Sequence, residues 1–164
     1  MVKLNKKGYL AVEVILASVV AVSIAVFLID LTVKMVNKTN DNYTNTLFLT
    51  DKALITNHLR KEIKQDIQSN EGLKSAGIKN GSCYLEYKNG SGKWINISKD
   101  EENRDAITYS PGYSKTINKD IKYSDINIKC TLENNYLIIK INFEDIFTTN
   151  NNRDIEIVLY NSTK

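Results

Sequence analysis

Residues 9–71 contain neither glycine nor proline, and this absence limits the structures that the first part of the chain can form. Glycine and proline are the residues that most strongly interrupt helices, and the nearest glycines, Gly8 and Gly72, stand just outside the stretch. A continuous helix of about 60 residues would be roughly 90 Å long. The sequence therefore predicts a long helix that begins near the N-terminus and extends to residue 71.

The first part of this stretch is apolar and long enough to cross a membrane. Residues 9–29 contain a single charged side chain, Glu13, and as a helix they would span about 30 Å, the thickness of the hydrocarbon core. Three lysines precede the run, Lys3, Lys6 and Lys7. Because basic residues stay on the cytoplasmic side, we expect a cytoplasmic leader over 1–8, a transmembrane helix over 9–30 and the rest of the chain outside the cytoplasm.

Glu13 needs an explanation, because a charged side chain in a membrane-length segment costs free energy. The cost is about 2.5–3.5 kcal/mol at a helix centre and less near an end. The segment reads Lys6-Lys7-Gly8, then Tyr9, with Glu13 five residues after the glycine. This arrangement resembles the prepilin signal of type IV pilins and pseudopilins. The resemblance implies that a prepilin peptidase cuts between Gly8 and Tyr9 and methylates the new N-terminal amine of Tyr9.

The resemblance covers roughly residues 1–35 and has two departures. The family usually continues after the cut with Phe-Thr-Leu-Ile-Glu, whereas residues 9–13 of this chain read Tyr-Leu-Ala-Val-Glu. The glycine and proline that many major pilins carry further along the helix are also absent. These departures indicate a minor component more than a major subunit. The implied partners are the prepilin peptidase, sister pilin subunits, a platform protein and an assembly ATPase, in a filament for adhesion, motility, secretion or DNA uptake.

The position of Glu13 also has a physical rationale in such a filament. When helices bundle side by side with staggered ends, each free N-terminal amine is a buried cation that needs a partner. A carboxylate five residues along a neighbouring helix can supply that partner and fix the axial register. We therefore expect Glu13 to set the registry between subunits.

Two other interpretations of the N-terminus stay open. A secretory signal peptide would be cut near Ser23-Ile24-Ala25, although the apolar run continues past that point to Ile29. A signal anchor would keep the leader and hold Glu13 near the lipid headgroups. In the latter case the chain is a single-pass membrane protein that displays a small β-rich extracellular binding domain.

Beyond the membrane segment, residues 31–71 become amphipathic. Apolar side chains recur there at three- and four-residue steps: Leu47, Leu54, Ile55, Leu59, Ile63 and Ile67. Residues 37–46 are rich in Asn and Thr, which favour caps and turns, so the helix either continues through them or bends or breaks there. Since a long helix draws most of its stability from packing, we expect a partner for the apolar stripe.

Residues 72–164 are the predicted β-rich head, and residues 81–161 within it change to a period of two, which is typical of strands. The predicted strands cover 83–88, 93–98, 105–110, 126–132, 136–143 and 154–160, with loops at 112–124 and 145–152. The first two strands form a hairpin around a glycine turn over 89–92. The sequence therefore predicts an α+β fold in which the long N-terminal helix packs on a small antiparallel sheet. The resemblance independently implies the same general form.

Cys83 and Cys130 both lie in the apolar phase of their strands. Outside the membrane an oxidised pair is chemically permitted and would stabilise a small core. Two separate buried thiols are the alternative, because the sequence does not say whether the strands are neighbours. A metal site is not expected, since two cysteines and one distant histidine, His58, do not have ligand spacing.

The charge balance argues against a strong nucleic-acid-binding surface. The chain has 22 basic and 19 acidic side chains, and removal of the three leader lysines would leave a neutral mature chain. Aromatic residues interleaved with lysines, such as Tyr84, Tyr87 and Trp94, are compatible with contact to DNA or a glycan, but aromatic residues are also favoured in strands. No nucleophile, carboxylate-pair or phosphate-loop pattern occurs in the sequence, so neither an enzyme nor a cofactor is expected.

Overall fold

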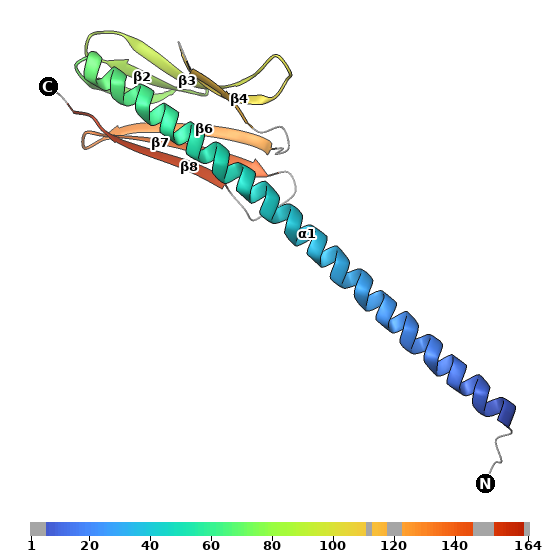
Figure 1. Cartoon of the computed structure of the whole chain (residues 1–164). Helices are drawn as coiled ribbons and strands as arrows, with labels where there is room; N and C mark the ends of the chain where they lie inside the picture. The colour runs from blue at the N-terminus through green and yellow to red at the C-terminus, as the bar shows by residue number, and fades with distance from the viewer. Residues whose placement is uncertain (1–5, 111–112, 118–122, 146–152, 163–164) are drawn as a thin grey trace. The chain divides into compact units, whose positions relative to one another are not determined.

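The computed structural model describes residues 6–110, 113–117, 123–145 and 153–162. One long helix, α1 (Lys6–Ser69), precedes the strands. The strands are β1 (Leu73–Lys79), β2 (Ser82–Tyr87), β3 (Gly92–Lys99), β4 (Asp105–Ser110), β5 (Tyr113–Thr116), β6 (Tyr123–Glu133), β7 (Tyr136–Asp145) and β8 (Arg153–Tyr160). Every described strand pair is antiparallel. The predicted α+β class, with a long N-terminal helix and a small antiparallel β-structure, is confirmed (Figure 1).

The helix passes through residues 37–46 without interruption, although their composition favours caps and turns. The Thr39 hydroxyl donates a hydrogen bond within the helix to the carbonyl oxygen of Met35 at 2.9 Å. Arg153 donates to Asn45 Oδ1 at 2.9 Å, so at least one of these polar side chains has a tertiary contact. Such bonds remove the competition that these side chains offer to the helical backbone.

The helix ends at Ser69, two residues before the predicted end. The chain leaves it through Glu71 and Gly72, whose φ angles are 62° and 97°. The Gly72 N–H donates to the carbonyl oxygen of Ile67 at 2.9 Å and so satisfies one of the last helical carbonyls. A residue without Cβ suits this left-handed conformation, which explains why the helix stops here.

Residues 44–164 form one of two compact units in the chain, and their strands are distributed over two sheets. The first has the order β1-β2-β3-β4-β5 and the second has the order β6-β7-β8. Two hairpin turns contain consecutive residues with positive φ, Asn80-Gly81 (51° and 76°) and Asn134-Asn135 (49° and 64°). Asn and Gly tolerate this conformation, which matches the twist of the adjoining strands.

Two strands lie where the sequence does not predict them. β1 has a single buried side chain, Leu73, so its pattern does not alternate, and it forms because β2 offers a pairing edge. β5 lies within the predicted loop 112–124 and pairs with β4, with Thr108 opposite Ser114. The other predicted strands are confirmed. The predicted loop over 145–152 lies outside the described residues except for its first residue.

The core of residues 44–164 combines one face of α1 with both sheets (Figure 1). Four helix residues spaced by four are exposed by 2% or less: Ile55, Leu59, Ile63 and Ile67. They confirm most of the predicted stripe, whereas Leu54 is 41% exposed, contrary to the prediction. A spacing of four returns to the same face of a helix, and residue 54 lies about 100° away from that face.

Candidate functional site

The predicted processing residues lie at the start of α1. Lys6, Lys7, Gly8 and Tyr9 form its first turn, and Glu13 lies one turn further along the helix. The Glu13 side chain is exposed. None of the ion pairs among the described residues involves Glu13, so the described part of the chain brings no cation to it.

The N-terminal unit, residues 1–43, has an exposed apolar surface along α1. Every large hydrophobic residue between positions 10 and 36 is exposed, by 37% at Leu31 and by more elsewhere. The helix is long and apolar enough to cross a membrane, as judged by length and composition. Soluble monomers rarely expose contiguous apolar patches larger than a few hundred Å², so this surface requires lipid or other protein around it.

The serine side chains of this segment suit an apolar environment. The hydroxyl of Ser23 donates to the carbonyl oxygen of Val19 at 2.8 Å. Such a bond satisfies the hydroxyl inside the helix, where hydrocarbon offers no partner. Asp30 and Lys34 form an exposed ion pair at 2.7 Å immediately after the apolar run. The apolar run of the helix therefore ends at residue 29.

A partly buried polar cluster joins the end of α1 to the five-stranded sheet. Tyr109 donates to Asp66 Oδ2 at 2.5 Å, and Lys93 Nζ lies 2.7 Å from the same oxygen. The hydroxyl oxygens of Tyr109 and Tyr87 are 2.7 Å apart. Burial is the main cause that raises the pKa of both tyrosines above the ordinary value of 10.0, so both stay neutral. Sequence reasoning missed this cluster, because its members lie in four separate segments without a shared motif.

Cys83 of β2 and Cys130 of β6 form a disulfide, with their Cα atoms 5.8 Å apart. Both cysteines are buried. The bond joins the five-stranded sheet to the three-stranded sheet. Of the two interpretations that the sequence leaves open, the structure therefore has the oxidised pair.

The aromatic residues considered for DNA or glycan contact pack on the protein itself. The ring centroids of Tyr84 and Trp94 are 4.6 Å apart, and Lys79 Nζ is 3.9 Å from the centroid of the Tyr84 ring. A Cβ on Gly92 would collide with the Tyr84 ring, so this ring covers the glycine. Tyr87 belongs to the buried cluster. These contacts account for the rings without a ligand.

The acidic side chains near β4 hold loops together. Asp100 accepts hydrogen bonds from Arg104 Nε at 2.8 Å and from Thr116 Oγ1 at 3.0 Å. The Arg104 hydrogen bond is the main cause that lowers the pKa of Asp100 to about 2.

Among the described residues, no group of three or more His, Cys, Asp or Glu side chains could hold a metal ion. His58 is exposed on α1.

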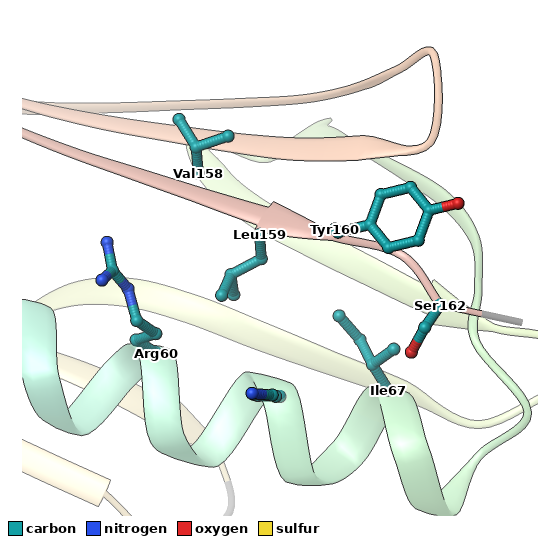
Figure 2. Close-up of a pocket in the computed structure, with 7 residues that line it drawn as sticks. Arg60, Ile67, Val158, Leu159, Tyr160 and Ser162 are labelled. Atoms are coloured by element: carbon teal, nitrogen blue, oxygen red, sulfur yellow. The ribbon is translucent and has the colours of Figure 1, made fainter.

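A groove of about 400 Å³ lies between the C-terminal turns of α1 and strand β8 (Figure 2). It is lined by Arg60, Lys64, Ile67, Val158, Leu159, Tyr160 and Ser162. In Figure 2, Arg60 extends from the helix toward the strand, and Leu159 points from the strand toward the helix. Sequence reasoning missed the groove, and the one available signal is the recurrence of Lys52, Arg60 and Lys64 at multiples of four along α1.

No family model, no curated protein and no solved structure matches this chain.

Proposed function

We propose that this chain is a minor pilin-like subunit that is processed after Gly8 and assembled through its N-terminal helix into a type IV pilus-like filament. The observation that carries the proposal is the helix segment 10–29, whose large hydrophobic side chains are exposed and whose one charged residue is Glu13. Such a segment suits storage in a membrane and also bundling with equivalent helices, because both environments bury apolar surface.

Glu13 has a defined task in this proposal. Cleavage creates a free amine on Tyr9, and bundling carries that amine away from water. A carboxylate of the adjacent subunit then supplies the counter-charge, because a paired charge tolerates low dielectric far better than a lone one. The pairing forms when neighbouring subunits are staggered along the axis, so it selects one register of the bundle.

The head, residues 72–164, would be displayed outside the cytoplasm. Its disulfide suits an oxidising compartment, in which such bonds form and persist. The proposal requires a prepilin peptidase, a platform protein, an assembly ATPase and sister pilin subunits. The system that the filament serves, whether adhesion, motility, secretion or DNA uptake, would follow from those partners.

The first test is the mass of the N-terminal peptide of the full-length protein extracted from membranes. We expect a start at Tyr9, heavier by one methyl group, when an active prepilin peptidase is co-expressed, and an uncut chain with an inactive peptidase. A retained leader over 1–8 despite active peptidase would instead make the chain a signal-anchored protein that displays a β-rich binding domain. A start near residue 26 would indicate a secreted protein.

The second test separates registry from processing. We expect Glu13→Gln to accumulate in the membrane and to be lost from the sheared filament fraction, because the neighbouring amine would lack its counter-charge. Asp30→Asn is the matched control, since it also neutralises one acid on the same helix but outside the apolar run. If Glu13→Gln and Asp30→Asn assembled like the wild type, the registry role would be wrong.

A further inference from the structure

The edge of β8 that faces away from β7 has backbone groups to which another strand could bind. β8 is the last strand of the three-stranded sheet, and within the described residues β7 is its one strand neighbour. In an antiparallel strand the backbone groups of alternate residues point toward opposite sides. One set of N–H and C=O groups of β8 is therefore directed away from β7, where another strand could add.

The register of the sheet identifies this outward set. Glu133 and Tyr136 flank the two-residue turn between β6 and β7, so the backbone of Tyr136 bonds to β6 and that of Leu137 to β8. Leu137 lies opposite Leu159. The backbone N–H and C=O groups of the odd-numbered residues of β8 therefore point toward β7. The outward groups belong to Asp154, Glu156, Val158 and Tyr160.

A row of cations on α1 runs along this edge. Lys52 already contacts it, since its Nζ donates to the carbonyl oxygen of Asp154 at 2.8 Å, in agreement with the outward direction of that carbonyl. Arg60 and Lys64 follow about two and three turns later and line the groove with Val158 (Figure 2). Neither Arg60 nor Lys64 takes part in an ion pair among the described residues.

The apolar lining of the groove also suits a strand. Ile67 and Leu159 form a buried base at 2% and 7% exposure, while Val158 and Tyr160 are 45% and 59% exposed. Natural sheets usually protect their edges with charges, bulges or prolines, because a flat apolar edge is a template for pairing. The end of β8 that lines the groove has the apolar side chains of Val158, Leu159 and Tyr160. Glu156, the nearest acid on β8, already pairs with Lys140 at 3.2 Å, and the cations that line the groove belong to the helix.

We propose that the groove between α1 and β8 binds an extended, acidic segment of a partner protein, which adds to β8 as a fourth strand. Its backbone would bond to the outward groups of Glu156 and Val158 and to the N–H of Tyr160, about 4.8 Å from β8, since the Tyr160 carbonyl oxygen already accepts from the Ser162 N–H at 3.1 Å. Its acidic side chains would pair with Arg60 and Lys64, which lack acidic partners in the described part of the chain. This inference is independent of the proposed filament function, because it uses no residue of the N-terminal unit.

Charge and backbone together favour a peptide over a nucleic acid. A phosphate backbone would use Arg60 and Lys64 but would leave the outward N–H and C=O groups of β8 without ladder partners. An acidic strand satisfies both sets of groups, because a strand supplies donors and acceptors at the spacing of the edge.

The test uses detergent-solubilised full-length protein and a short fluorescent peptide in which Glu alternates with Val. We expect saturable binding that weakens as salt is raised. The charge-reversed double variant Arg60→Glu/Lys64→Glu should weaken binding at least about tenfold, as expected when charge pairs across an interface are lost. Lys61→Glu is the matched control, because Lys61 is exposed on α1 but does not line the groove, and it should leave binding unchanged.

Val158→Pro tests the strand ladder directly. Proline removes the outward N–H and is tolerated on edge strands at such positions, so the fold should persist while peptide binding falls at least about tenfold. Val158→Thr keeps the N–H and the β-branch and should bind like the wild type. If Val158→Pro does not fold, amide hydrogen exchange of the wild-type protein tests strand addition instead. Bound peptide should slow the exchange of the Glu156 and Val158 amides.

Three results would overturn the inference. The first is no binding of the peptide at millimolar concentration. The second is binding that responds to Arg60→Glu/Lys64→Glu but not to Val158→Pro, because the groove would then recognise charge alone. The third is tighter binding of a single-stranded oligonucleotide, together with unchanged amide exchange at Glu156 and Val158, which would identify a nucleic-acid surface.

Discussion

Asp66 links three structural elements through one carboxylate. It lies on α1 and contacts Tyr109 of β4 and Lys93 of β3. We expect Asp66→Asn to lower the free energy of unfolding by about 1–3 kcal/mol, because Lys93 would lose its counter-ion while its side chain is 24% exposed. Urea unfolding of the full-length protein in detergent would measure the change.

The Lys74–Glu86 ion pair provides the control for this substitution. Its two side chains are 64% and 28% exposed, so solvent screens the charges more strongly than at Asp66. Glu86→Gln removes one charge from that pair and should change stability much less than Asp66→Asn. Equal effects of the two substitutions would mean that the buried cluster is not a specific stabilising contact.

The ionisation of Asp100 makes the free energy of unfolding depend on pH. Its pKa falls from the ordinary 3.8 to about 2 in the folded state, chiefly through its hydrogen bond with Arg104. Because the pKa is lower in the folded than in the unfolded protein, Asp100 stabilises the fold fully at pH values above its unfolded pKa. This contribution is lost as the pH falls from about 4 to about 2. We expect Asp100→Asn to flatten the decline of unfolding free energy over that range, whereas Glu101→Gln should leave it steep. Urea unfolding at a series of pH values would distinguish the two.

At the scale of elements, the buried face of α1 packs against the sheets and contributes to the stability of the fold. Ile63 is fully buried and Leu54 is 41% exposed, although both are aliphatic residues of the same helix. We expect Ile63→Ala to destabilise the protein by about 2–5 kcal/mol, because it removes packed atoms and leaves a cavity. Leu54→Ala should change stability by less than about 0.5 kcal/mol. Thermal unfolding of the two variants measures the difference, and similar losses would show that the packed face is misassigned.

At the scale of the whole molecule, the Cys83–Cys130 disulfide closes a loop between residues 47 positions apart. We expect the double variant Cys83→Ala/Cys130→Ala to lose about 2–4 kcal/mol, since the unfolded chain regains the freedom that the bond removes. Denaturant unfolding of the variant and of reduced wild type should agree. Labelling of both thiols in protein isolated from an oxidising compartment would contradict the pairing.

Much of the fold was predictable from local sequence. The absence of glycine and proline over 9–71 predicted the helix, and the period of two predicted most of the strands, because both signals depend on residues close together in the chain. β1 and β5 were not predictable in this way. Their sequences lack a regular alternation, and each forms by pairing with a neighbour that already has a core-facing side.

The sequence by itself determined the long helix, its membrane-length apolar half and the acid at position 13, because composition and spacing alone specify these features. The prepilin-like processing of that segment stays a prediction. Tertiary structure decided the division into two sheets, the Cys83–Cys130 pair, the cluster around Asp66 and the free edge of β8 beside Arg60. Each of these depends on distances between residues far apart in the chain, and such distances are set by packing of the whole core, which no local pattern encodes.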